Sequence, residues 1–161
     1  MASNMYLKFE DPDVHGARTA PGHAGEIEVL SWSHGFTQPT SPTRSSAGGG
    51  TVEQANHQNF TFRKYLDSAS NEILKLTWSG RQIKKATLSC YRSDGANDRE
   101  VLYLIVTMDH VIISNYSVSG GPGDVPVENV SLDYGRVQYT YKDQKQKDSS
   151  ATHDLQNRTV Q

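Results

Sequence analysis

The strongest fold signal in this sequence lies in the stretch Gly25-Glu26-Ile27-Glu28-Val29-Leu30-Ser31-Trp32-Ser33-His34-Gly35. Alternating apolar and polar residues are typical of a β-strand, in which successive side chains point to opposite faces. Ile27 and Val29 would share one face of such a strand. Leu30 and Trp32 would share the other. In a strand with one face in water, the apolar residues stay at odd positions or at even positions throughout (a single apolar parity). The change from odd to even positions here predicts either a bulge or a strand with both faces buried, one by the core and the other by a neighbouring chain.

Length and charge restrict the class of protein. The chain has 161 residues and a mass of 17.8 kDa, which suits one domain because domains hold roughly 100 to 200 residues. Its 16 Lys and Arg against 18 Asp and Glu leave a formal net charge of -2. No overall field therefore favours nucleic acid or an anionic membrane. No apolar run approaches the ~20 residues that a membrane helix needs, so we predict no nucleic-acid partner and no membrane insertion.

The first residues, Met1 to Glu10, contain neither a basic region nor a continuous apolar region, so they are not expected to form a secretory signal. We expect the protein to be made and folded in the cytoplasm. Any export would use a route that does not read signal peptides.

Segments rich in Val, Ile, Leu, Thr and Tyr, separated by turn residues, predict a mainly β fold. One helix is expected at Ala69–Thr77, with an N-cap at Asp67 or Ser68 and an end at Gly80. This pattern favours a β-barrel of two packed antiparallel sheets with one short α-helix. The expected strands are Met5–Phe9, Glu26–Phe36, His57–Tyr65, Ile83–Tyr91, Glu100–Ser114 and Val125–Tyr141.

Other features set the expected organisation of the domain. Residues 37–56 start with a run rich in Pro, Ser, Thr and Gly, and they predict a long extended loop. A change of apolar parity near Gly135 predicts a bulge in the last strand. Residues 142–161 are polar and predict an exposed C-terminal tail. We expect a single β domain over residues 1–141 that carries the loop and is followed by the tail.

The sequence contains no recognisable catalytic or metal-binding motif. No serine lies in a Gly-x-Ser-x-Gly motif, and Gly48-Gly49-Gly50 lacks the Lys-Ser/Thr pair of a phosphate loop. The single Cys90 falls in a strand pattern, as is typical of a small buried thiol. We predict no catalytic residue, no metal and no cofactor. The histidines are scattered without metal-ligand spacing: His15, His23, His34, His57, His110 and His153.

Four blocks of sequence occur in a specific order. They are Glu26-Ile27-Glu28-Val29-Leu30-Ser31-Trp32-Ser33-His34-Gly35, Phe60-Thr61-Phe62-Arg63-Lys64-Tyr65-Leu66-Asp67-Ser68-Ala69-Ser70, Tyr103-Leu104-Ile105-Val106-Thr107-Met108-Asp109-His110-Val111-Ile112-Ile113-Ser114 and Glu128-Asn129-Val130-Ser131-Leu132. Each block alone is a weak signal. In this order they closely resemble the haemolysin-coregulated protein (Hcp) family, the tube protein of the type VI secretion system. The similarity runs from Met5 to about Tyr141.

The resemblance implies a β-barrel of which six copies close into a ring with a wide central channel. Rings stack into a tube, so the chain would be a structural component and not an enzyme. The contractile apparatus expels the tube into a neighbouring cell or the medium, which provides export without a signal peptide. Small effector proteins carried in the channel, and the sheath, spike and baseplate proteins, are the implied partners.

Under this resemblance three groups of residues are candidate sites. Ser31 and Ser33 are candidates for the channel lining, where they would contact cargo. Candidates for ring-to-ring contact lie in the extended loop, namely Thr37, Pro39, Ser45, Gly48, Gly49 and Gly50. Candidates for the core or a subunit interface are Leu30, Trp32, Phe60, Phe62, Leu104 and Val106.

Two other interpretations stay open. A small β-barrel enzyme or effector would have a catalytic cleft with convergent titratable groups. A monomeric barrel that binds a sugar or nucleic acid would have an aromatic groove. Phe60 and Phe62, which precede Arg63 and Lys64, are compatible with a nucleic-acid stacking strand, but the acidic balance favours a core face with solvated cations.

Overall fold

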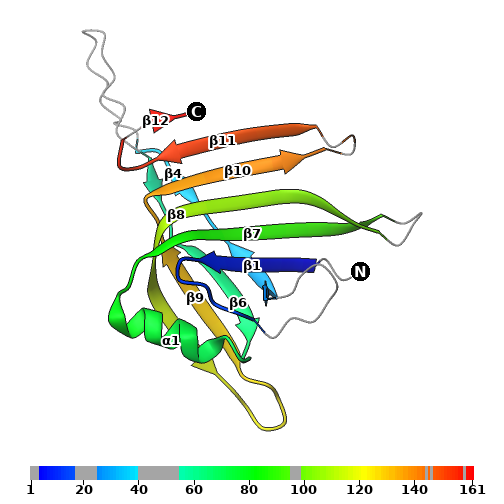
Figure 1. Cartoon of the computed structure of the whole chain (residues 1–161), viewed down its shortest axis with the longest axis vertical. Helices are drawn as coiled ribbons and strands as arrows, with labels where there is room; N and C mark the ends of the chain where they lie inside the picture. The colour runs from blue at the N-terminus through cyan, green and yellow to red at the C-terminus, as the bar shows by residue number, and fades with distance from the viewer. Residues whose placement is uncertain are drawn as a thin grey trace.

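The computed structural model describes residues 4–16, 25–39, 55–94, 99–143, 145, 147–157 and 159–161. In chain order its elements are β1 (Asn4–Glu10), β2 (Ile27–Glu28), β3 (Ser31–Ser33), β4 (Phe36–Thr37), β5 (Asn56–His57), β6 (Phe60–Tyr65), α1 (Ser70–Ser79), β7 (Ile83–Asp94), β8 (Arg99–Ser119), β9 (Val127–Asp133), β10 (Arg136–Lys142), β11 (Asp148–Asp154) and β12 (Thr159–Val160). Figure 1 shows their arrangement.

Two antiparallel sheets form the body of the molecule (Figure 1). Sheet A has the strand order β12-β11-β10-β8-β7-β1-β2, and sheet B contains β3, β6, β9 and the C-terminal part of β8. Strand β8 is long enough to serve both sheets, because it pairs with β7 up to Val111 and with β9 from Ile112 onward. The predicted mainly β fold with two sheets and one helix is confirmed, although the described strands do not close into a continuous barrel.

The parity switch near the start of the chain marks a change of sheet. The N–H of Val29 donates to the carbonyl of Met5 in sheet A at 2.9 Å. The N–H of the next residue, Leu30, donates to the carbonyl of Arg63 in sheet B at 2.7 Å. The predicted single strand Glu26–Phe36 is therefore wrong, because this segment forms separate short strands in different sheets. Neither a bulge nor a second buried face is needed to explain its pattern.

A similar crossover replaces the bulge expected near Gly135. Strand β9 ends at Asp133 and β10 starts at Arg136, so the chain passes from sheet B to sheet A within two residues. The N–H of Gly135 donates to the carbonyl of Asp109 on β8 at 2.9 Å. Strands β9 and β10 belong to different sheets, and each directs one face toward the core that lies between the sheets. The positions of the apolar residues therefore change from even to odd where the chain crosses from β9 to β10.

Helix α1 starts and ends close to the predicted positions. The carboxylate of Asp67 accepts a hydrogen bond from the N–H of Ala69 at 2.9 Å, although Ala69 is the N-cap. At the other end Gly80 has φ +66°, and its N–H donates to the carbonyl of Leu76. Glycine suits this left-handed C-cap because it has no Cβ.

The core lies between the two sheets and α1. Burial of each large apolar side chain there contributes ~1.5–3 kcal/mol. Of the residues expected in the core or an interface, Phe60, Phe62 and Val106 are fully buried, and Trp32 and Leu104 pack against the core while partly exposed. Leu30 is 38% exposed at the crossover between sheets. The remaining core includes Leu7, Phe9, Ile73, Leu76, Leu88, Met108, Val130 and Leu132.

Most of the expected C-terminal tail belongs to sheet A. Strand β11 pairs with β10 along its whole length, from Arg136↔Asp154 to Lys142↔Asp148, and β12 pairs with β11. These strands are mostly exposed, as their polar sequence predicts. The apolar pattern missed them because backbone hydrogen bonds to the edge of β10, and not a buried face, hold them in place.

Candidate functional site

The outer face of sheet B is lined by short polar side chains. In one row, Ser33, Thr61, Ser131 and Asn115 are cross-strand neighbours on β3, β6, β9 and β8. In the next row, Ser31, Arg63, Asn129 and Ser117 are neighbours on the same strands. We call these eight residues the polar face. Their sequence neighbours Trp32, Phe62 and Val130 point to the core, because side chains alternate along each strand.

Hydrogen bonds order part of the polar face. The hydroxyls of Thr61 and Ser131 lie 3.0 Å apart on adjacent strands. Beside them, Asn59 donates to the hydroxyl of Ser114 at 3.1 Å, and Ser114 donates to the carbonyl of Ser131 at 3.3 Å. Thr–Ser pairs of this kind stabilise neighbouring strands by about 0.2–1 kcal/mol each. Apart from Arg63, the face is therefore a preorganised surface of neutral hydroxyl and amide groups.

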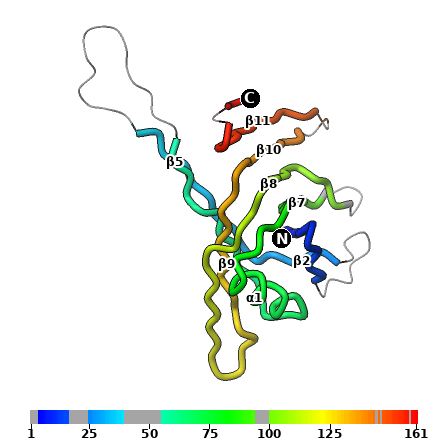
Figure 2. The backbone as a smooth tube through the Cα atoms, turned by 60° about the vertical axis from the view of Figure 1, so that its left-hand side comes forward, coloured from blue at the N-terminus to red at the C-terminus, as the bar shows by residue number. Residues whose placement is uncertain are grey.

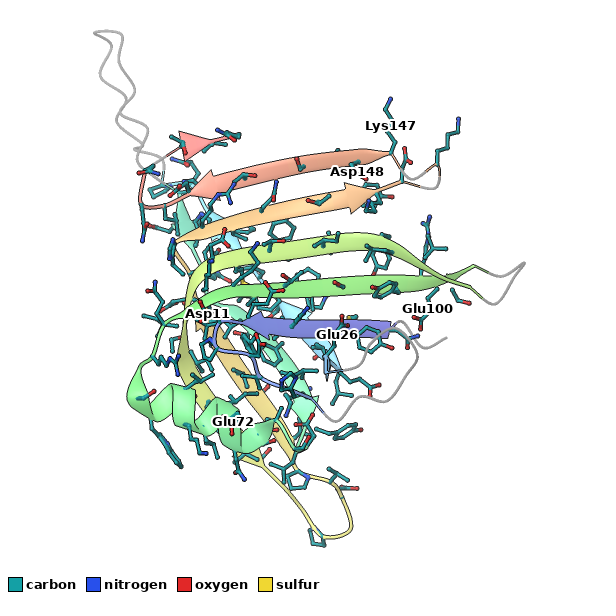
Figure 3. The ribbon with its side chains drawn as sticks, in the orientation of Figure 1. Asp11, Glu26, Glu72, Glu100, Lys147 and Asp148 are labelled. Carbon is teal, nitrogen blue, oxygen red and sulfur yellow. The ribbon has the colours of Figure 1, made fainter. Side chains whose placement is uncertain are left out.

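The only charged member of the polar face is Arg63. Figure 3 shows labelled charged side chains elsewhere: Glu72 on α1, Asp11 after β1, Glu100 near the start of β8, and Lys147 and Asp148 at the turn between β10 and β11. The eight residues of the face contain no carboxylate, histidine or cysteine that could act as general base or nucleophile. The arrangement suits weak, reversible hydrogen bonding and not acid–base chemistry.

The structure places the predicted channel residues together. Ser31 and Ser33 are exposed and belong to neighbouring rows of the polar face. Of the predicted loop residues, Thr37 pairs with Asn56 in the β4–β5 ladder, and Pro39 lies just beyond it. Ser45, Gly48, Gly49 and Gly50 lie outside the described residues.

Tyrosines and histidines from distant parts of the chain form a second polar group. Nδ1 of His34 lies 2.5 Å from the Tyr139 hydroxyl, and its Nε2 lies 2.7 Å from the Tyr134 hydroxyl. Nδ1 of His57 lies 2.6 Å from the same Tyr134 hydroxyl, and its Nε2 lies 2.6 Å from Nδ1 of His153. We call these five residues the His–Tyr cluster. Sequence reasoning missed it because its members are far apart in the sequence and share no motif.

The environment of the His–Tyr cluster favours neutral side chains. Burial, followed by the charge of His57, lowers the pKa of His34 from 6.5 to about 4. Burial and then the charge of His153 lower the pKa of His57. Burial raises the pKa of Tyr139 to about 12, and burial followed by Tyr139 and Asp133 raises that of Tyr134. These shifts favour the neutral forms of His34, His57, Tyr134 and Tyr139 near pH 7.

A buried ion pair joins β6, β9 and the start of α1. Nζ of Lys64 lies 2.5 Å from Oε1 of Glu128 and 2.9 Å from the carboxylate of Asp67. The same ammonium donates to Ser70 Oγ at 3.2 Å, and Ser70 donates to Glu128 at 2.7 Å. Tyr116 donates to the other Glu128 oxygen. The expectation that Lys64 is a solvated cation is therefore wrong, since its side chain is fully buried.

Cys90 is buried in sheet A. Burial raises the pKa of its thiol to about 11, and hydrogen bonds with Trp32 and Tyr103 offset part of this shift. A thiol with this pKa is almost entirely protonated near pH 7 and is a poor nucleophile.

Exposed apolar side chains gather where β6 ends and β8 turns back into β9. Tyr65, Leu66, Val118 and Val125 are each about half exposed. The N–H of Leu66 donates to the carbonyl of Pro126 at 3.0 Å, which joins the two segments at this end of sheet B. We call these four residues the end patch. Exposed apolar side chains that lie at one end of a domain are candidates for contact with a partner.

In the part of the chain that the structure describes, no three or more His, Cys, Asp or Glu side chains are placed to ligate a metal ion. The single helix in that part of the chain is too short and too polar to span a lipid bilayer.

The fold and these surfaces define a class of protein: a two-sheet β protein with a largely neutral polar strand face and exposed apolar side chains at one end. Residues 6–141 match the family described as "Type VI secretion system effector, Hcp". The chain belongs to this family and is a type VI secretion protein, not a member of a known enzyme family.

Individual relatives agree with this assignment. Protein hcp1 of Pseudomonas aeruginosa is 36% identical over 146 residues, which span 90% of this chain and 86% of the relative. The crystal structure of Hcp1 from Salmonella typhimurium superposes with a TM-score of 0.79 at 28% identity, covering both chains completely. A structure described as a type six secretion system protein has a TM-score of 0.84 at 24% identity, covering 99% of this chain and 100% of that one, and supports the fold.

Proposed function

We propose that this protein is the inner-tube component of a type VI secretion system and forms stacked hexameric rings that are expelled with small effectors in their channel. Family membership supports the secretion role, and the ring of six copies follows from the family resemblance. The observation on which the proposal rests is the polar face of sheet B, a two-row surface across four strands in which seven of the eight side chains are neutral and Arg63 is charged.

A surface made mainly of neutral hydroxyl and amide groups suits the lining of a transport channel. Cargo must be retained during assembly and released after export, which requires many weak contacts and few strong charges. Hydroxyl and amide groups exchange hydrogen bonds with water at little net cost, so contacts with them are each worth only about 0.5–1.5 kcal/mol. Ser31 and Ser33 would contact cargo at the edge of this surface.

The end patch supports assembly of copies. Tyr65, Leu66, Val118 and Val125 expose apolar area that a partner copy would cover. Strands β4 and β5 form an arm that Figure 2 shows directed away from the two sheets. A projecting arm of this kind could reach the next ring and add to its contacts.

The native mass tests the proposal. Size exclusion with light scattering should give a mass of six chains, and electron microscopy of the same fraction should show rings. A monomer across a wide concentration range would overturn the ring assembly and favour the alternative, a small β-barrel binding module or secreted effector that forms no tube. Sheath, spike and baseplate proteins of the same system are the partners to test next, together with secretion of the protein by cells.

A further inference from the structure

The β4–β5 arm continues from β3 and β6 of sheet B and reaches sheet A through side chains. Strands β4 and β5 pair with each other and with no other described strand. At the base of this arm the N–H of Gln58 donates to the carbonyl of Gly35 at 2.9 Å, which again links the two sides of the arm. His34 and His57 contact the body by hydrogen bonds to Tyr134, Tyr139 and His153.

Aromatic rings of the arm and its base also contact rings on β10 and β11. The rings of His34 and Tyr139 are stacked with centroids 5.8 Å apart, and Phe36 on β4 lies edge-on to Tyr139 at 6.0 Å. The rings of His57 and His153 lie 4.7 Å apart. The arm therefore meets β10 and β11 through the His–Tyr cluster.

The number of protons that the His–Tyr cluster can hold is limited by its four hydrogen bonds. Each of them requires one hydrogen atom between its donor and its acceptor. With every side chain neutral, one consistent chain of donation runs from Tyr139 to His34, Tyr134, His57 and His153, and the reverse chain also works. A single added proton on any histidine still leaves one hydrogen in every contact.

A second proton at the end of the chain breaks this pattern. If His57 and His153 are both protonated, both nitrogens of their 2.6 Å contact carry a hydrogen and neither can accept. Two positive charges then also repel each other across adjacent rings. Since the contact joins β5 to β11, its loss removes the hydrogen bond that holds the arm to β11, while His34 can still contact Tyr134 and Tyr139.

We propose that the His–Tyr cluster is a pH-sensitive clasp that joins the β4–β5 arm to β10 and β11 while the cluster is uncharged and loosens the arm from β11 when His57 and His153 are both protonated.

The neighbouring charges do not oppose this release. Asp133 on β9, Arg136 on β10 and Asp154 on β11 are the charged residues beside the cluster, and in the described part of the chain none of them hydrogen-bonds to His57 or His153. Asp154 accepts hydrogen bonds from the N–H groups of Gln156 and Asn157, and Arg136 pairs with Asp109 at 3.1 Å. Among the described residues, no carboxylate accepts a hydrogen bond from His57 or His153 that would compensate a second positive charge.

The direction of the pH effect follows from the histidine environments. The closed arm lowers the pKa of His34 and His57 below 6.5, so the open arm binds protons more readily. The free energy that favours the closed arm is fully present above pH ~6.5 and is lost as the pH falls below it. Acidic conditions favour release.

The consequence for assembly rests on the proposed function. If the loop of residues 37–56 contacts the next ring, release of its base at acid pH would weaken stacking. The clasp itself can be tested without stacking, in whatever oligomer the purified chain forms.

The test combines NMR titration of labelled histidines with hydrogen exchange from pH 7 to pH 4. Protection factors of amides in β4 and β5 should fall at least tenfold as His57 and His153 titrate, while those of β7 and β8 stay constant. His153→Asn keeps a polar atom near the position of Nδ1 but cannot be protonated, so the fall should disappear. The control His110→Asn changes an exposed histidine with φ +56°, a conformation that Asn tolerates, and should behave as the unchanged protein.

Two results would overturn the clasp. One is unchanged protection of the arm at pH 4 with both histidines protonated; the other is equal loss of protection in His153→Asn. Loss of protection in β7 and β8 at the same pH would also count against it, because the transition would then be global unfolding. If the protein forms rings but the arm does not respond to pH, the clasp is rejected and the proposed tube function stands. If the protein is a monomer whose arm responds to pH, the tube is rejected and the clasp stands.

Discussion

Lys64 on β6 and Glu128 on β9 are direct cross-strand partners, with Nζ and Oε1 2.5 Å apart and both side chains fully buried. They occupy core-facing positions of sheet B, next to the helix start. Asp67, Ser70 and Tyr116 satisfy the remaining polar atoms of the pair. The charged pair thus replaces apolar packing where β6, β9 and α1 meet.

Breaking this pair should destabilise the protein strongly. Lys64→Met leaves the buried Glu128 carboxylate without its main partner, which should lower the free energy of unfolding by about 3–5 kcal/mol. Urea denaturation at a fixed protein concentration measures the loss. The double variant with Glu128→Leu is the control, because it removes both charges and should recover most of the stability; an equally unstable double variant would show that packing and not charge is responsible.

Phe60 should be a major contributor to core stability. Its ring is fully buried and stacks on Trp32 with centroids 5.6 Å apart. Phe60→Ala should cost about 3–5 kcal/mol through lost burial and the cavity that remains, and it should change the fluorescence of Trp32. Trp78→Ala is the matched control, since that ring is 77% exposed and its loss should cost less than ~0.5 kcal/mol. Similar losses in both variants would contradict the described core.

Ser33→Gln should reduce cargo retention. The longer side chain would protrude from the edge of the polar face and displace weak contacts with a protein in the channel. We expect rings of unchanged size that retain several-fold less of a co-expressed effector from the same secretion system through size exclusion. Ser150→Gln, an exposed change on β11, is the control. Unchanged retention in Ser33→Gln would remove Ser33 from the candidate lining.

Shortening the extended loop should affect stacking and not ring closure. Deletion of residues 45–50 removes the middle of the loop while keeping both arm strands, β4 and β5. Rings should still form, but tubes seen by electron microscopy should be shorter or absent. Normal tubes from the shortened protein would exclude this part of the loop from ring-to-ring contact.

Stability should depend on pH through His34. Its pKa is lowered to about 4 in the folded protein, so the unfolded chain binds the proton first as the pH falls from 6.5. The resulting loss between pH 6.5 and 4 should be ~1–2 kcal/mol once solvent screening of this partly exposed group is allowed for. His34→Asn should lack this component of the urea-derived pH profile, whereas His15→Asn, at an exposed site, should retain it. If the free energy of unfolding has the same pH dependence in the unchanged protein, His34→Asn and His15→Asn, His34 is not the source of the effect.

Local patterns predicted most elements because their causes are local. The alternation in Met5–Phe9 corresponds to β1, and the apolar spacing of Ala69, Ile73 and Leu76 with Gly80 behind them corresponds to α1. The predictions failed where the chain changes sheets. At Val29–Leu30 and at Tyr134–Gly135 the sequence contains only a parity change, which a bulge would also produce.

Some residues of the candidate site could be predicted from the sequence and others could not. Ser31 and Ser33 could be selected from the sequence, through strand alternation and the family resemblance. Their neighbours Asn115, Asn129 and Ser131 could not, because only strand register places them in the same rows. Lys64 looked solvated because its partner Glu128 lies on another strand.

The sequence by itself determined most of the strands and the helix, the small negative net charge and the family, since strand and helix patterns and family motifs lie in short windows of residues. Only the tertiary structure decided the sheet crossovers, the burial of Lys64 with Glu128 and the assembly of His34, His57 and His153 with two tyrosines. These contacts join residues far apart in the chain. Their energies depend on distances and desolvation that exist only after the sheets have packed.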